Sequence, residues 1–218
     1  MTKWLSLFTL LLLSQIATQA QSFSPVKDIQ SFENQLEKTT KDLVSIESDF
    51  VQKKYLDVLS EEIESEGKLW YKKENKIRWH YKVPFDYLVI LNNGKISIND
   101  EGNKNSFDLS GNKTFDKVNA MIVRSMQGRG ITQDSDYETQ VLESKTQFLV
   151  KLKPKEAKVK EYIQTIEVYF SKKDYHVDAV KMIEPAGDYT HILFKNRKIN
   201  GSVADQLFIM QKQVGGHN

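Results

Sequence analysis

The chain has 218 residues, of which 39% are hydrophobic and 28% charged, and its net charge is only +2. These proportions are typical of a globular protein with enough apolar residues for a core, and sheet-rich chains of this length commonly form one domain. Lysine and glutamate are interspersed along the chain, whereas nucleic-acid binding favours a concentrated basic face. We therefore expect no nucleic-acid partner. The one basic run, "KLKPKEAKVK" at 151–160, is either a solvated turn or a weak contact for an acidic surface.

Residues 1–20 are predicted to be a secretory signal peptide that is cleaved after Ala20. Lys3 precedes an apolar run at 5–13, and Thr18 and Ala20 occupy the small-residue positions of a cleavage site. The apolar run is shorter than the roughly 20 residues that a membrane span needs. The signal predicts an exported protein, and a bacterial periplasm fits best.

The chain contains no cysteine. An exported protein without cysteine has no disulfide framework, so the burial of apolar surface must stabilise it. It also lacks the thiol that would carry an amino-terminal lipid. We expect residues 21–218 to form a single soluble, unanchored domain.

The first element after the signal is predicted to be an amphipathic helix. Ser24 is a hydroxyl cap, and Pro25 suits the first helical position, where its missing N–H costs nothing. Apolar residues then recur at helical spacing through about Lys38, namely Ile29, Phe32 and Leu36.

From Leu43 the period changes to two, which predicts a strand that includes Phe50. The segment "GKLWYKKENKIRWHYKVP" at 67–84 follows as a hairpin. One of its faces is apolar, made by Leu69, Tyr71, Ile77, Trp79 and Tyr81. The other is basic, made by Lys68, Lys72, Lys76, Arg78 and His80, and Trp70 interrupts it. The aromatic face is either the core of a packed barrel or the wall of a space for a greasy ligand.

Asn93–Gly94 is the strongest turn signal in the chain and predicts a second hairpin. Five later strands are predicted at 139–143, 147–153, 161–170, 175–183 and 189–196. The segment "FDKVNAMIVRSMQGRG" at 115–130 is instead predicted to be a second amphipathic helix, with Met121, Ile122 and Met126 on its apolar side. This pattern describes an α+β fold, an antiparallel sheet with helices over one face.

Motifs for catalysis or metal binding are absent from the sequence. The four histidines, His80, His176, His191 and His217, have no i+2 or i+4 partner among themselves. There is no HExxH motif, P-loop, GxSxG elbow or GxGxxG loop. We therefore name no catalytic residues, metal or cofactor, and expect that the protein is not an enzyme.

The segment at 48–84 resembles the amino-terminal signature of the periplasmic outer-membrane lipoprotein carriers of the LolA type. A Phe-x-Gln-x-Lys strand is followed by a Gly-x-Leu-Trp strand, a basic turn and a Trp strand that ends near proline. The matching residues are Phe50, Gln52, Lys54, Gly67, Leu69, Trp70, Trp79 and Pro84. Segments "ILNNGKISIND", "FLVKLKPKE" and the final meander are also similar, so the resemblance covers nearly the whole chain after residue 20.

This resemblance implies an incomplete, open antiparallel β-barrel, with helices covering its concave face as a lid. Carriers of this family take the acyl chains of lipoproteins released at the inner membrane and deliver them to an outer-membrane acceptor. The implied partners are acylated lipoproteins, an inner-membrane releasing transporter and that acceptor, with transient membrane contact and a monomeric carrier. The implied wall of the acyl-chain cavity comprises Ile29, Phe32, Leu36, Phe50, Leu69, Tyr71, Ile77, Trp79, Tyr81, Met121, Ile122 and Met126.

Two positions depart from the family pattern. Well-known carriers have an arginine after the basic residue that follows the Trp strand, and it holds the lid closed by hydrogen bonds. Here Lys73 stands there, and lysine lacks the guanidinium fork. Arg78 is a substitute for this latch or a charge on the solvent face. The carboxyl end, "FIMQKQVGGHN", lacks the expected Pro-Gly turn.

Three hypotheses follow for the function. The leading one is a periplasmic lipoprotein carrier or a related carrier of another lipid. The second is a lipid-binding sensor or adaptor without transfer, and the third is a lipid-processing enzyme.

Overall fold

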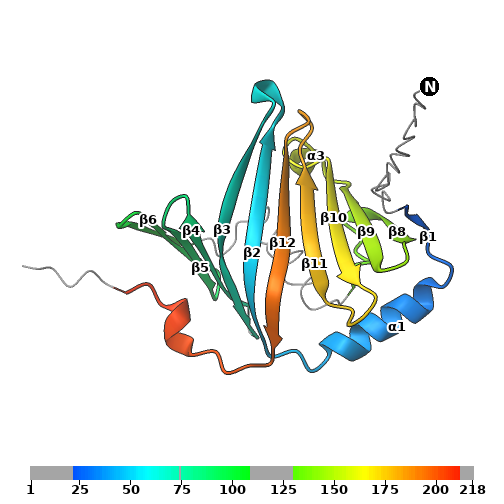
Figure 1. Ribbon diagram of the computed structural model, residues 1–218, viewed down its shortest axis with the longest axis horizontal. Helices are drawn as coiled ribbons and strands as arrows, with labels where there is room; N and C mark the ends of the chain where they lie inside the picture. Colours follow the sequence, from blue (N-terminus) through cyan, green and yellow to red (C-terminus); the bar gives the residue numbers. More distant parts are fainter. Residues whose placement is uncertain (1–21, 74, 109–129, 212–218) are drawn as a thin grey trace, which may run out of the picture.

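The computed structural model describes residues 22–73, 75–108 and 130–211 (Figure 1). Its strands form one twelve-stranded sheet in the order β1-β8-β9-β10-β11-β12-β2-β3-β4-β5-β6-β7, and all neighbouring pairs are antiparallel. The two terminal strands of this order, β1 and β7, do not pair with each other, so the sheet is open. The strands are β1 (Ser24–Pro25), β2 (Ser45–Leu56), β3 (Glu61–Lys72), β4 (Lys76–Val83), β5 (Tyr87–Asn92), β6 (Lys95–Asp100), β7 (Asn103–Asp108), β8 (Tyr137–Glu143), β9 (Gln147–Pro154), β10 (Thr165–Ser171), β11 (Val177–Ile183) and β12 (Tyr189–Ile199).

Four helical segments accompany the sheet in the described residues. They are α1 (Ile29–Thr40), η1 (Asp57–Leu59), α3 (Ala157–Lys160) and η2 (Asp205–Phe208). In Figure 1 the hairpin of β2 and β3 projects at the top, with η1 at its tip, and α1 runs along the opposite end. The fold is an α+β, open antiparallel barrel with a helix as lid, as the sequence predicted.

Helix α1 packs against the inner face of the sheet through its apolar stripe. Phe32 and Leu36 are each only 1% exposed. The ring centroid of Phe32 lies 4.6 Å from that of Phe148 on β9 and 5.8 Å from that of Phe170 on β10. These residues belong to a cluster beneath β8–β11, called the first core here, which also contains Tyr137, Val141, Val150, Leu152, Val159, Ile163, Ile166 and Val168.

The start of α1 differs from the prediction. Ser24 and Pro25 form β1, which pairs with β8, and the helix begins four residues later. Its cap is Asp28, whose side chain accepts a hydrogen bond from the backbone N–H of Ser31 at 2.9 Å. The prediction of Ser24 as the cap was therefore wrong. Ser24 and Asp28 are both residue types that cap helices, but Ser24 pairs with β8 as part of a strand, which leaves Asp28 as the cap. The second expected helix, at 115–130, lies almost entirely outside the described residues.

The predicted hairpins are confirmed, with two local differences. Asn93 and Gly94 have φ values of 51° and 77°, as a type I′ turn between β5 and β6 requires. The strand expected from residue 161 begins only at Thr165, because α3 turns the chain and buries Val159 in the first core. Strand β7 was not predicted, since its sequence "NKNSFD" is polar, exposed and lacks alternation.

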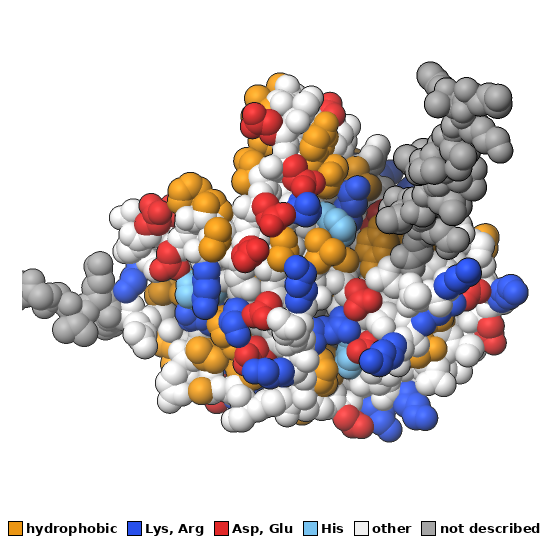
Figure 2. Space-filling model, viewed as in Figure 1, with side chains coloured by type: hydrophobic (Ala, Val, Ile, Leu, Met, Phe, Trp, Pro, Cys, Tyr) orange, Lys and Arg blue, Asp and Glu red, His pale blue; other side chains and the backbone are white. Residues whose placement is uncertain are grey.

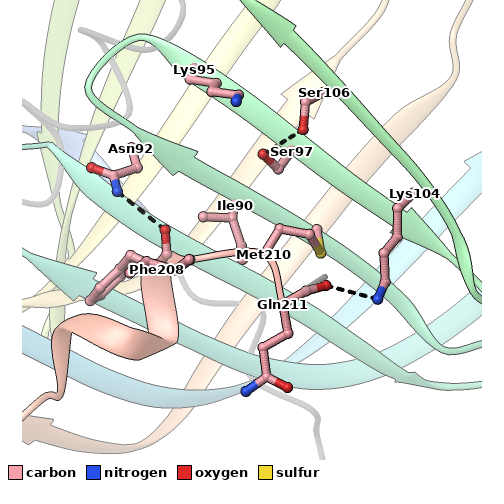
Figure 3. A pocket seen from close by; sticks show the side chains of 10 residues that line it. Ile90, Asn92, Lys95, Ser97, Lys104, Ser106, Phe208, Met210 and Gln211 are labelled. Atoms are coloured by element: carbon pink, nitrogen blue, oxygen red, sulfur yellow. Dashed lines mark hydrogen bonds between the residues drawn. The ribbon is translucent and has the colours of Figure 1, made fainter. Parts of the chain in front are cut away.

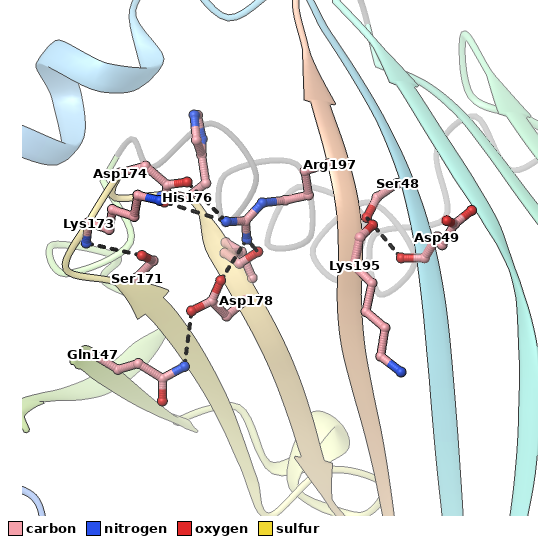
Figure 4. Close-up of polar contacts among 11 residues, drawn as sticks. Ser48, Asp49, Gln147, Ser171, Lys173, Asp174, His176, Asp178, Lys195 and Arg197 are labelled. Carbon is pink, nitrogen blue, oxygen red and sulfur yellow. Dashed lines mark hydrogen bonds and ion pairs between the residues drawn. The ribbon is translucent and has the colours of Figure 1, made fainter.

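A β-bulge in β12 is held by one arginine. Register shifts between Lys195 and Lys198, and Asn196 adopts a φ of 52°. Nη1 of Arg197 donates to Oδ1 of Asp178 at 2.8 Å, and Nη2 donates to Oδ2 of Asp174 at 3.1 Å (Figure 4). The guanidinium fork thus ties the bulge to β11, through Asp178, and to the turn before it, through Asp174.

Candidate functional site

The predicted aromatic face exists and lies on the inner side of the sheet. Across β2, β3 and β4 the cross-strand partners are Ile46, Tyr71 and Ile77 in one row, Ser48, Leu69 and Trp79 in the next, and Phe50, Gly67 and Tyr81 in the third. Six of the predicted site residues therefore share one surface. The basic residues of the same hairpin alternate with them and point to the outer side, where lysines and arginines are interspersed with acidic residues (Figure 2).

Gly67 allows the third row to form. A Cβ atom at Gly67 would lie 2.1 Å from the carbonyl oxygen of His80 and 2.8 Å from Cζ of Phe50. The ring of Phe50 thus lies over the bare glycine backbone, at a register shift between β3 and β4. Its centroid is 5.1 Å from that of Trp79 and 5.0 Å from that of Tyr81, so the three rings pack as one group.

Burial decreases along this face from one end of the sheet to the other. Tyr71 is 0% and Leu69 2% exposed, and both are packed in a second core that also contains Leu43, Ile46, Phe50, Ile77 and Leu91. Trp79 and Tyr81 are half-buried. Further toward the projecting hairpin, Ile63 on the same face of β3 is 47% exposed. The accessible part of the inner face is therefore the part nearer the hairpin tip.

Half-buried apolar side chains continue from β4 across β12 to β11, and together they form what we call the inner strip. Register places Phe194 opposite Phe50, and Ile192 opposite both Gln52 and Val180. The inner strip connects the first and second cores and consists of Trp79, Tyr81, Ile192, Phe194, Val180 and Met182. Sequence reasoning missed its last four members, although alternation in the predicted strands at 175–183 and 189–196 could have identified them.

The polar groups of the inner strip are neutral. The hydroxyl of Tyr81 donates to Oε1 of Gln52 at 2.9 Å, and burial, with the neighbouring Tyr87, raises the pKa of Tyr81 to about 12. The indole Nε1 of Trp79 is buried and forms no hydrogen bond, although it lies close enough to the Tyr81 hydroxyl to oppose the rise in the pKa of Tyr81. Lys54 lies on the same side of β2 and forms an ion pair with Glu184, so its charge is balanced. An uncharged, largely apolar surface of this kind suits alkyl chains better than ionic ligands.

The other predicted site residues are more scattered. Phe32 and Leu36 lie in the first core, whereas Ile29 is 47% exposed. Lys73, the first latch candidate, is exposed, and its backbone N–H donates to the carbonyl of Val44 at 2.8 Å. Met121, Ile122 and Met126 lie outside the described residues.

Arg78, the second latch candidate, points to the outer side of β4. Its Nη1 donates to the carbonyl oxygen of Leu207 at 3.0 Å. This position does not fit a latch for a lid on the inner face, because successive side chains of a strand point to opposite faces and Trp79 occupies the inner side.

Side chains that could bind a metal ion do not converge in the described ranges. No three histidine or acidic side chains there lie close enough to hold a metal ion. Burial lowers the pKa of both His176 and His191, which disfavours their charged forms. None of the helices within those ranges is long and apolar enough to cross a membrane.

Comparison with known proteins gives a family and several distant structures. The profile of the family described as outer membrane lipoprotein carrier protein LolA matches residues 41–211. No curated protein matches the chain. A LolA superfamily protein from Nitrosomonas europaea is 9% identical with a TM-score of 0.43, and the match covers 83% of this chain and 97% of that chain. The Mycobacterium tuberculosis lipoprotein LppX is 12% identical with a TM-score of 0.45, covering 80% and 96% of the two chains.

The Pseudomonas aeruginosa MucA/MucB complex is also similar, at 12% identity and a TM-score of 0.47, covering 83% of this chain and 60% of that chain. These structures are too distant to carry an argument about ligands. The family profile, in contrast, spans most of the chain, including the strands of the inner strip. The chain therefore belongs to the LolA family of outer membrane lipoprotein carrier proteins.

Proposed function

We propose that this protein is a periplasmic carrier that holds the acyl chains of lipoproteins against the inner strip and moves them from the inner to the outer membrane. The observation that carries the proposal is the inner strip itself. Its side chains are apolar and half-buried in an open sheet, whereas those of the two cores are fully packed. Side chains that remain partly accessible are available to a ligand, and membership of the LolA family supports acyl chains as the class of ligand.

The energetics favour a surface of this kind. Acyl chains gain about 0.8 kcal/mol per methylene in a membrane, so a chain of about sixteen carbons is worth on the order of 12 kcal/mol. A carrier must recover much of this free energy and still release its cargo. Half-buried aromatic and methionine side chains provide apolar contact while adapting to chains of different shape.

The unpaired indole N–H of Trp79 adds a polar feature to this surface. A buried donor without an acceptor costs about 1–3 kcal/mol. The ester or amide carbonyl of an acylated cargo would supply the missing acceptor. Trp79 is therefore the residue of the inner strip that we expect to contact the acyl linkage.

The test is binding of a fluorescent acylated lipopeptide to the purified, delipidated protein. Trp79→Glu places a carboxylate in the inner strip, and we expect affinity to fall by at least tenfold, since burying an unpaired charge costs more than about 1.4 kcal/mol. The matched control is Leu193→Glu, because Leu193 is half-buried on the outer side of β12, between Ile192 and Phe194.

Equal affinities for the parent and Trp79→Glu would refute the proposal, provided that both are folded by circular dichroism. Transfer is tested separately by adding acceptor membranes to the loaded protein. Movement of the lipopeptide to the membranes supports a carrier, whereas retention would indicate the sensor or adaptor. Conversion of the lipopeptide to another compound would indicate an enzyme.

A further inference from the structure

The outer face of β3–β7 is covered by the carboxyl-terminal segment at 201–211. Val203 and Phe208 are 8% and 2% exposed, and they pack against Leu88 and Ile90 on β5. Side chains from the sheet donate hydrogen bonds to four backbone carbonyls of the segment: Lys72 to Val203 (3.0 Å), Arg78 to Leu207 (3.0 Å), Asn92 to Phe208 (3.2 Å) and Lys104 to Gln211 (2.8 Å).

A pocket of about 370 Å³ lies between this segment and the sheet. Arg78, Asn99 and Lys104 supply its polar wall, and Leu88, Leu207 and Met210 supply much of its apolar wall. Figure 3 shows the neighbouring pocket, which shares Lys104 and Met210 and where the ammonium of Lys104 reaches Gln211. Small-molecule sites commonly have volumes of about 300–1,000 Å³, so the space is large enough for a ligand.

The charges in this pocket are not balanced by the described residues. Nε of Arg78 is buried without a hydrogen-bond partner, and no carboxylate of the described ranges forms an ion pair with Arg78 or Lys104. Asp86 influences Arg78 through space, but its carboxylate is already bound to His80 at 2.7 Å. A half-buried guanidinium with a free N–H destabilises the fold unless an anion accepts a hydrogen bond from it.

We propose that this pocket binds a phosphate group, whose oxygens accept from Nε of Arg78 and from the ammonium of Lys104 while apolar parts of the ligand contact Leu207 and Met210. Two cations lining one space suit a phosphate, which offers more acceptor oxygens than a carboxylate. The group belongs either to a lipid headgroup or to a free phosphate. The site is separate from the inner strip, because Arg78 and Trp79 point to opposite faces of β4.

Trp70 provides a reporter for this pocket, since its ring centroid lies 5.7 Å from Cζ of Arg78. Trp4→Phe and Trp79→Phe leave Trp70 as the only tryptophan of the chain. We would titrate this variant with inorganic phosphate and with monomeric dihexanoyl phosphatidylglycerol, using sodium chloride at equal ionic strength as the reference. We expect a saturable change in Trp70 emission that sodium chloride does not produce.

Arg78→Gln should weaken phosphate binding by about tenfold or more, and Lys104→Gln by a smaller factor, because each removes a charged hydrogen bond. Lys195→Gln, which changes an exposed lysine of β12, is the control and should leave the affinity unchanged. Isothermal titration calorimetry checks the same affinities in the parent protein. Tighter binding of the lipid would identify a headgroup, and equal binding would identify free phosphate; both support the site. Absence of saturable binding, or equal affinity in the parent, Arg78→Gln and Lys104→Gln, would overturn it, whatever the acyl-chain assay shows.

Discussion

Gly67 offers the most direct test of how the inner face is built. In Gly67→Ala the new methyl group would meet the backbone oxygen of His80 at 2.1 Å, so β3 and β4 must move apart at their register shift. The contact with Phe50 at 2.8 Å comes from a ring that is itself only 2% exposed and has little room to yield. Overpacking of a core commonly costs about 1–3 kcal/mol, and a clash with backbone places this change at about 3 kcal/mol or above.

The free energy of unfolding of Gly67→Ala is measured by urea denaturation, with tryptophan fluorescence as the signal. Gly201→Ala is the matched control, because a Cβ there meets nothing within 4 Å and the expected change is within about 0.5 kcal/mol. Since Gly67 also positions Phe50 against Trp79, acyl-chain affinity should fall in the fraction that stays folded. A destabilisation of Gly67→Ala no larger than that of Gly201→Ala would refute the close approach of β3, β4 and Phe50.

Two further predictions concern ion pairs outside the inner strip. Burial alone would raise the pKa of Glu167, but hydrogen bonds from Lys151 and Tyr169 outweigh the effect of burial and hold the pKa below 4.5. The ionised carboxylate therefore stabilises the fold above pH 4.5, and this stabilisation is lost as the pH falls below that value. The difference in Tm between the parent and Glu167→Gln should therefore be constant above pH 4.5 and shrink below it in thermal scans; a difference that does not change with pH would contradict this. Arg197→Lys should lower the free energy of unfolding, measured by urea denaturation, by about 1–2 kcal/mol, because lysine cannot bind Asp174 and Asp178 with one planar fork. A loss of less than about 0.5 kcal/mol would show that the bulge in β12 does not depend on the guanidinium fork.

Alternation in the sequence predicted the inner face well, because a strand with one buried side must place apolar residues at every second position. Tyr71, Ile77 and Trp79 lie on the same face for this reason. Alternation alone does not tell how deeply each residue is buried. Tyr71 and Trp79 have the same pattern around them, yet Tyr71 is 0% exposed and Trp79 is half-buried. Tyr71 lies within the second core, which includes Leu43 from outside the sheet, whereas Trp79 only packs against that core.

The outer face shows a second limit of prediction from the sequence. Arg78 belongs to the basic face of the hairpin and Trp70 is the apolar residue that interrupts it, and the hairpin itself shows no reason for either. The reason is more than 120 positions away along the chain. The carbonyl of Leu207 accepts the hydrogen bond of Arg78, and Trp70 packs against the cluster that includes Val203 and Phe208. A contact of this kind joins segments with no shared periodicity, so local patterns carry no signal for it.

Successive side chains of β4 point to opposite faces of the sheet, so this one strand contributes to two surfaces with different chemistry. Trp79 and Arg78 are neighbours in the chain, yet the indole belongs to an uncharged inner strip and the guanidinium to a charged outer pocket. Keeping the charge on the far side matters physically, since a guanidinium among acyl chains would need an anion with it or would lose its hydration without compensation. Cargo binding and anion binding should therefore be separable by single substitutions, with Trp79→Glu affecting the first and Arg78→Gln the second. If each variant impaired both, the two sites would be coupled through the backbone of β4, and the sheet would transmit a signal between its faces.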